Sequence, residues 1–278
     1  MQTHELLDRF ELLYPDNTAL SDLRRAYIEK DVSSIVRIID KNNKADLLRF
    51  VMDDHMWGAW PVLDQYAQTQ FVKAFKDFYV NDIKIADDCF SRGQLQSKMW
   101  ITEQLKKLDL KLGTVFLCAG WYGTLATMLF ENDLDIKKIR SFDIDKSCWK
   151  IAETFNKPWV MKDWQFKSCT QNIHDIDYST HVYNVNRSNG TTCELTDSPD
   201  TIINTSCEHL ENFTEWYNKI PAGKILILQT NNYFDLDEHV NCSKSVEDFG
   251  KITPMQKVYF EGELGLEKYS RYMRIGLK

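Results

Sequence analysis

The sequence has little of what marks fibrous, disordered or disulfide-linked proteins. It contains 11 glycines and 6 prolines among 278 residues, too few for a fibrous or low-complexity chain. Its seven cysteines form no C-x-x-C pair, and their spacing fits neither a zinc ribbon nor a disulfide framework. We therefore expect buried free thiols in a reducing compartment. The N-terminus is polar and shows no secretory signal, which favours a cytoplasmic location.

Positive charge and long hydrophobic runs are also scarce. Lysine and arginine total 34 against 41 acidic residues, the net charge is −7, and no basic block stands out. Binding to a nucleic-acid backbone needs a basic face, so duplex DNA is disfavoured and a small molecule, a nucleotide or a protein is the expected partner. One uncharged stretch, 112–130, approaches the length of a membrane span. It contains threonines, glycines, a tryptophan and a tyrosine and has no basic flank, so we predict no membrane segment.

The spacing of apolar residues along the chain changes near residue 93. Residues 1–92 carry apolar side chains at helical spacing, as in the stripe Phe71, Phe75, Phe78 and Tyr79, which predicts an N-terminal helical region. From residue 113 on, short apolar runs alternate with helical patterns, which is typical of a parallel α/β sheet and predicts one domain over 93–278. The predicted strands are 114–118, 138–142, 166–170, 201–204 and 224–229, with a hairpin turn at Asn189-Gly190 and a final antiparallel pair at the sheet edge.

The stretch VFLCAGWYGTLATMLF, residues 115–130, predicts a strand, a glycine-containing turn and a helix. Such a turn lets a ligand approach backbone N–H groups at the start of a helix, and glycine is needed there because a side chain would block the approach. Twenty residues after Gly123, Asp143 ends the second predicted strand. A carboxylate at that place is positioned to accept both hydroxyls of a ribose. The unit predicts a site for a nucleoside-containing cofactor.

This order of elements resembles the class I S-adenosylmethionine-dependent methyltransferases, over roughly residues 95–278, and is closest in character to bacteriophage-encoded members. The resemblance implies a Rossmann-like, mostly parallel seven-stranded sheet with an antiparallel C-terminal strand pair, S-adenosylmethionine as cofactor, and the host cytoplasm as location if the protein is viral. It implies that the loop wraps the methionine part of the cofactor, that Asp143 holds the ribose, and that neighbouring side chains meet the adenine. The implied cofactor residues are Ala119, Gly120, Trp121, Tyr122, Gly123, Asp143, Ile144, Asp145, Asn172 and Asn204.

The turn departs from the family pattern of an acid followed by G-x-G-x-G. Leu117 stands where the acid belongs, and Ala119 and Trp121 replace two glycines. The usual anchor of the methionine amino group is therefore absent. The segment SRGQLQSKMW could supply a substitute, with Arg92, Gln94 and Lys98 as polar candidates.

A second group, NTSCEHL, follows the fourth predicted strand, where the carboxyl ends of parallel strands face a ligand. Glu208 and His209 are the candidate catalytic residues, because imidazole is a natural general base near neutral pH and a neighbouring carboxylate can orient it. The alternative is that they cap a helix and pair with each other. The pair resembles the E-x-x-E-H motif of ubiquinone-pathway and small-RNA methyltransferases, which can bind a divalent metal. Thr205 stands where the first glutamate belongs, so we predict no metal site.

A third group follows the fifth predicted strand. Asn231, Asn232 and His239 lie on a loop that should overhang the same crevice, and the alternative is ordinary loop polarity. Together these features predict methyl transfer from S-adenosylmethionine to an oxygen or nitrogen of a small molecule, nucleotide or protein. Two alternatives stay open, transfer of the aminocarboxypropyl group of the same cofactor and a catalytically inactive binding subunit.

Overall fold

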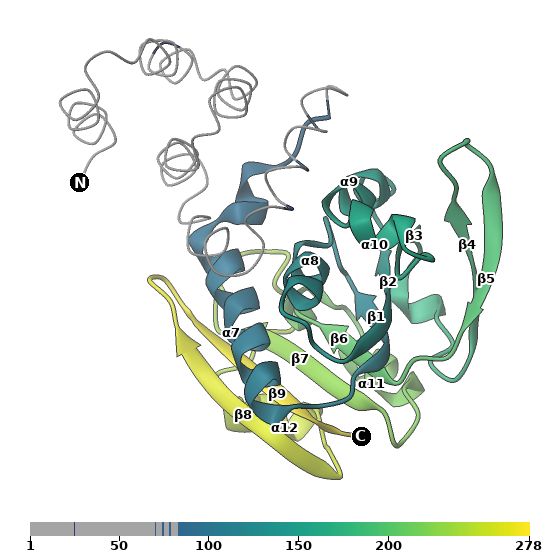
Figure 1. Cartoon of the computed structure of the whole chain (residues 1–278). Coiled ribbons are helices and arrows are strands. Elements are labelled where there is room, and N and C mark those ends of the chain that lie inside the picture. The colour runs from purple at the N-terminus through teal and green to yellow at the C-terminus, as the bar shows by residue number, and fades with distance from the viewer. Residues whose placement is uncertain (1–24, 26–69, 71–73, 75–77, 79–82) are drawn as a thin grey trace. The chain divides into compact units, whose positions relative to one another are not determined.

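A computed structural model describes residues 25, 70, 74 and 78 and the continuous range 83–278 (Figure 1). The chain divides into two compact units, Met1–Gln96 and Ser97–Lys278, and the account below concerns the second. Almost all of the predicted N-terminal helical region lies outside the described residues. That region, and its expected boundary at 92/93, stay predictions.

The second unit is built on a seven-stranded sheet. Its strands are β1 (Gly113–Cys118), β2 (Ile136–Asp143), β3 (Phe166–Thr170), β6 (Thr201–Asn204), β7 (Ile225–Asn231), β8 (Lys257–Gly265) and β9 (Ser270–Leu277). They lie in the order β3-β2-β1-β6-β7-β9-β8. The pairs from β3 to β7 are parallel, and β9 runs antiparallel to both β7 and β8. This order confirms the predicted Rossmann-like, mostly parallel sheet with its antiparallel C-terminal pair.

Helices cover both faces of the sheet (Figure 1). They are α7 (Arg92–Leu108), α8 (Thr124–Glu131), α9 (Cys148–Phe155), α10 (Lys157–Met161), α11 (Phe213–Lys219) and α12 (Val246–Ile252). Successive strand residues point to opposite faces, so in β1 Val115 and Leu117 pack with α7, α8 and α9, with the partly buried Trp159 of α10 against the same cluster. Phe116 and Cys118 pack on the other side with α11 and α12. The result is a three-layer arrangement with two apolar cores.

Two strands form a separate hairpin beside β3 (Figure 1). β4 (His181–Asn186) and β5 (Thr192–Asp197) pair antiparallel around a turn in which Gly190 has a φ of +81°, as the Asn189-Gly190 signal predicts. The base of the hairpin is tied to β2, because Asp197 receives hydrogen bonds from Lys138, from Nε of Arg140 at 2.7 Å and from the hydroxyl of Tyr183. Burial alone would raise the pKa of Asp197, and these three bonds hold it below its usual range.

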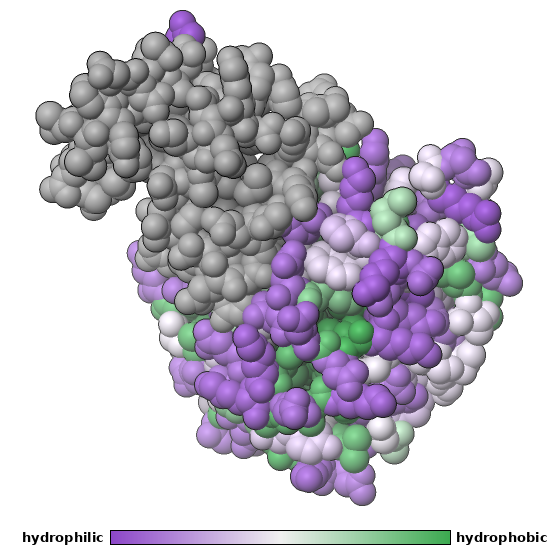
Figure 2. Space-filling view, in the orientation of Figure 1, coloured by the Kyte–Doolittle hydropathy of each residue, from purple (hydrophilic) through white to green (hydrophobic). Residues whose placement is uncertain are grey.

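The expectation of buried free thiols is confirmed for most of the cysteines. All seven cysteines are free thiols, and five of them are buried. None of the described helices combines the length and hydrophobicity that crossing a bilayer requires. On the face shown in Figure 2, hydrophilic residues dominate the described surface, and hydrophobic residues gather near its middle.

Candidate active site

The loop between β1 and α8 adopts a backbone conformation that ordinary residues avoid. Ala119 and Trp121 have φ values of 50° and 47°, and Gly123, which precedes α8, has 66°. A non-glycine residue in this left-handed region costs about 1–2 kcal/mol, and such strain gathers at functional sites. A Cβ atom on Gly120 would lie 2.1 Å from Oγ of Ser141. Close packing therefore requires glycine at position 120.

A buried asparagine that the sequence analysis missed holds this loop in place. Nδ2 of Asn156 donates to the carbonyl oxygens of Gly123 at 3.0 Å and Ala152 at 2.9 Å, and its Oδ1 accepts from Thr127 at 3.1 Å. Asn156 is fully buried, so these bonds join the loop, α8 and α9 without competition from water. An asparagine just after a helix gives no sequence signal for such a role.

Asp143, at the end of β2, binds the backbone of the same loop. Its Oδ2 accepts from the N–H of Trp121 at 2.8 Å and its Oδ1 accepts from the N–H of Asp145 at 3.0 Å. Burial raises the pKa of Asp143, and these backbone bonds oppose the rise. Each carboxylate oxygen keeps a lone pair for a further donor. Ile144 follows with 72% of its surface exposed, which leaves an apolar side chain uncovered beside the carboxylate.

The other predicted cofactor residues lie along the same edge of the sheet. Cys118 is in register with Phe142 of β2 and with Asn204 of β6. Asn204 is buried, its Oδ1 accepts from the N–H of Ser206 at 2.9 Å, and its Nδ2 donor has no hydrogen-bond partner. Asn172 caps a short 3₁₀ turn, since its Oδ1 accepts from the N–H of His174 at 2.9 Å.

The two aromatic residues of the loop stack on each other. The rings of Trp121 and Tyr122 lie 4.7 Å apart, with Tyr122 buried and Trp121 partly exposed. Of the polar candidates near α7, Lys98 is buried. Arg92 and Gln94 belong to the first unit, so their suggested role stays a prediction.

Glu208 pairs with Arg271, so the alternative in which Glu208 and His209 pair with each other is wrong. Oε1 of Glu208 accepts from Nη2 of Arg271 at 3.0 Å and from Nδ2 of Asn231 at 2.8 Å. Nη1 of Arg271 also donates to the carbonyl oxygen of Thr205 at 2.7 Å. Both charged side chains are almost fully buried. The helix expected to start at this place is a single 3₁₀ turn, Cys207–His209.

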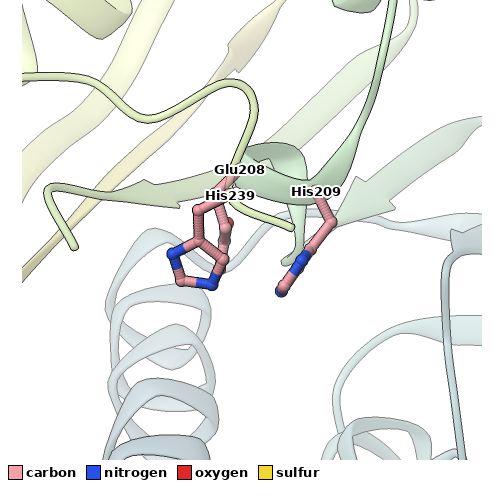
Figure 3. Close-up of side chains that lie close together, drawn as sticks. All are labelled: Glu208, His209 and His239. Carbon is pink, nitrogen blue, oxygen red and sulfur yellow. The ribbon is translucent and has the colours of Figure 1, made fainter. Parts of the chain in front are cut away.

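Glu208, His209 and His239 converge (Figure 3). One ligand atom from each lies within 4.8 Å of the others, and Oε2 of Glu208 is buried without a hydrogen-bond partner. Nδ1 of His209 lies 3.2 Å from the carbonyl oxygen of Glu238, and Nδ1 of His239 lies 2.6 Å from that of Tyr233. A carbonyl oxygen only accepts, so in the neutral rings Nδ1 carries the proton and Nε2 keeps its lone pair.

The loop that carries His239 is fastened to the turn that carries Glu208. The N–H of Asn241 donates to the carbonyl oxygen of Glu208 at 2.9 Å, and its Nδ2 donates to that of Cys207 at 3.1 Å. Of the other two residues predicted on the loop, Asn231 is instead the last residue of β7 and binds Glu208, whereas Asn232 donates to the hydroxyl of Tyr272 at 3.2 Å. Of the three predicted residues, His239 and Asn231 therefore lie at the cluster, and Asn232 has a structural role.

The cluster offers one carboxylate oxygen and two imidazole nitrogens. This ligand set suits first-row divalent transition ions, and three protein ligands leave coordination positions open for an oxygen of a substrate. Both histidines bind backbone carbonyl groups through Nδ1, which is the usual way a protein fixes the orientation of metal-binding imidazoles. The prediction of no metal site missed this convergence, because His239 is thirty residues from His209 in the sequence.

No known family model matches the chain, and no curated protein is similar to it at a significant level. Among solved structures, the chain is similar to the N-methyltransferase NodS of Bradyrhizobium japonicum WM9, with 13% identity, 66% of this chain and 97% of that chain covered, and a TM-score of 0.45. It is also similar to magnesium protoporphyrin IX methyltransferase of Synechocystis PCC 6803 (15%, 84% and 96%, TM-score 0.43). The small RNA methyltransferase HEN1 matches at 16% over 70% of this chain and 27% of that chain, with a TM-score of 0.46. The fold is Rossmann-like. The strand order shows this, and these scores add no argument about activity or about the expected bacteriophage origin.

Proposed function

We propose that the protein transfers a methyl group from S-adenosylmethionine to an oxygen or nitrogen acceptor, with oxygen favoured. The observation that carries the proposal is the Asp143 carboxylate. It ends the second parallel strand, already fixes the strained loop through Trp121, and keeps free lone pairs beside the uncovered Ile144. In open α/β sheets a ligand binds at this edge of the strands.

The residues of this edge fit the cofactor. The two oxygens of Asp143 would accept the ribose hydroxyls, Ile144 would cover one face of the adenine, and Asn172 would meet its amino group. Residues 119–123 would wrap the methionine part, although the N–H groups of Gly120, Trp121 and Gly123 already donate within the protein. The unpartnered Nδ2 of Asn204 is a buried donor that a bound oxygen would satisfy. The cofactor supplies an electrophilic methyl group on a cationic sulfur, so the protein has only to align the acceptor and remove one proton.

The cluster at Glu208 fits that second task. Oε2 of Glu208 with Nε2 of His209 and of His239 would hold a divalent cation, which lowers the pKa of a bound hydroxyl group. Without a cation, Nε2 of His209 is the base that takes the proton of the acceptor. An oxygen acceptor is favoured because oxygen binds such a cation readily and because a hydroxyl must lose its proton before or during attack.

Calorimetry on the full chain tests cofactor binding. Isothermal titration with S-adenosylmethionine and S-adenosylhomocysteine should give saturable binding, and no heat from either at about millimolar concentration would refute the proposal. Mass spectrometry of the spent cofactor then separates the alternatives. S-adenosylhomocysteine identifies methyl transfer, methylthioadenosine identifies aminocarboxypropyl transfer, and an unchanged cofactor with every acceptor supports a binding subunit.

Spectroscopy tests the cation site without any acceptor. Addition of Co²⁺ should give visible absorption bands that disappear in His209→Ala and in His239→Ala. His174→Ala is the control, because His174 also hydrogen-bonds a backbone carbonyl, through Nε2, but lies outside the cluster. Bands that persist in both cluster variants would place the bound cation elsewhere and leave His209 as the base.

A further inference from the structure

The loop that carries His239 exposes an unusual share of the apolar surface. We call residues 232–241 the acceptor loop. Phe234 and Val240 are each 54% exposed and Leu236 is 36% exposed. Seven large hydrophobic side chains are exposed in the described part of the chain, and three of them lie on these ten residues. A concentration of exposed apolar side chains marks a surface that binds something.

The acceptor loop is held in one conformation by contacts within it and with the turn at Glu208 and Tyr269. The N–H of His239 donates to the carbonyl oxygen of Leu236 at 2.9 Å, and Asn241 fastens the end of the loop to the turn at Glu208. At its start, the ring of Tyr233 stacks on that of Tyr269 with centroids 5.5 Å apart and planes at 12°. The apolar side chains therefore extend from a fixed backbone next to the cluster. Little conformational entropy of the loop is lost when a ligand covers them.

The charge of the acceptor loop selects among acceptors. Asp235, Asp237 and Glu238 are all exposed, and residues 232–241 contain no lysine or arginine. The cation of the site, Arg271, is buried and already paired with Glu208. Phosphate groups brought to this loop would meet three carboxylates with no cation in the loop itself to compensate them, and like charges at an interface oppose binding.

We propose that the acceptor loop selects a small hydroxylated molecule with an apolar, uncharged or cationic body, and rejects nucleotides and nucleic acids. This deepens the proposed function and rests on it. Phe234, Leu236 and Val240 would cover the apolar body, and the unpartnered Oε2 of Glu208 together with the two imidazoles would receive the hydroxyl group. Of the acceptor classes that the sequence leaves open, the charge of the loop disfavours the nucleotide.

The test compares acceptors on the full chain with radiolabelled S-adenosylmethionine. The neutral and cationic probes are 4-methylcatechol and tyramine, and the anionic probes are adenosine 5′-monophosphate and a short single-stranded RNA. We expect methylation of a neutral or cationic probe with kcat/KM at least tenfold above that of either anionic probe. In Phe234→Ala the KM for the better probe should rise about tenfold with kcat unchanged, since the contact binds ground state and transition state equally. Phe234→Leu should restore most of the loss.

Val182→Ala is the matched control, because Val182 is an exposed apolar residue of the hairpin, 51% exposed and outside the site. Asp235→Lys combined with Asp237→Lys should raise kcat/KM for adenosine 5′-monophosphate relative to 4-methylcatechol. Preferred methylation of an anionic probe overturns the proposal. Cofactor binding without binding or methylation of any neutral or cationic probe also overturns it. Failure of the proposed function itself would differ, because the cofactor would then not bind.

Discussion

Replacing Asp143 by asparagine tests the cofactor site with almost no change in side-chain shape. The carboxylate accepts one backbone N–H on each oxygen, from Trp121 at 2.8 Å and from Asp145 at 3.0 Å. An asparagine supplies one oxygen and one NH₂ group, so one backbone donor then faces a donor. Hydrogen bonds to charged groups contribute about 1.5–3 kcal/mol each. Removing a half-buried charge offsets part of this loss, and we expect the free energy of unfolding to fall by about 1–2 kcal/mol.

The effect on cofactor affinity is larger. In the proposed site, one ribose hydroxyl would lose its charged acceptor in Asp143→Asn, and a loss of about 1.5–3 kcal/mol raises the Kd about 10- to 150-fold. Titration calorimetry with S-adenosylhomocysteine measures this directly, and thermal unfolding shows that the variant is folded. Asp133→Asn is the control with the same change of charge, at an exposed position that asparagine tolerates at its φ of 52°. A Kd for Asp143→Asn within threefold of the parent value would refute the assignment.

Three further predictions concern pH, the loop and the buried pair. Burial raises the pKa of Asp143, and the ribose hydroxyls of the proposed cofactor would favour the ionised carboxylate. Affinity for S-adenosylhomocysteine should therefore be full above this raised pKa and should fall at a higher pH than an ordinary aspartate would give. Calorimetry between about pH 7 and 4.5 measures this loss. Gly123→Ala should lower the free energy of unfolding by at least about 1 kcal/mol more than Gly223→Ala: both glycines have positive φ, but a Cβ at 123 would lie 2.9 Å from a buried side chain, whereas at 223 it meets nothing within 4 Å. Equal losses in denaturant unfolding would contradict this. Arg271→Met should cost about 3–5 kcal/mol because it leaves the Glu208 carboxylate buried and unpaired, and adding Glu208→Gln should recover much of it; purely additive losses would argue against the pair.

The strands could be predicted because their signals are local. Each buried strand is a short apolar run between turn residues, and the predicted 166–170 and 201–204 coincide with β3 and β6. The other predicted strands differ from β1, β2 and β7 by one or two residues at their ends. The edge occupied by Asp143 and Glu208 also followed from local order, because the carboxyl ends of parallel strands share one side of a sheet.

The partners of those residues could not be predicted, because they depend on contacts between distant segments. Glu208 was expected to meet its neighbour in sequence, yet its carboxylate binds Arg271, 63 residues later. Likewise, the asparagine that fastens the loop between β1 and α8 lies 33 residues after Gly123. Hydrophobic periodicity reports which face of an element is buried and carries no information about which polar side chain meets another.

The direction of β9 explains how the end of the chain reaches the site. The strands β1, β2, β6 and β7 are parallel and bring their last residues to one edge. An additional parallel strand would also bring its last residue there, but β9 is antiparallel to β7, so the start of β9 arrives instead, with Arg271 in register with Asn231. Both side chains then reach Oε1 of Glu208. They occupy that oxygen and leave Oε2 without a hydrogen-bond partner in the cluster with the two histidines, so the antiparallel pair that closes the sheet also orients the carboxylate of the site.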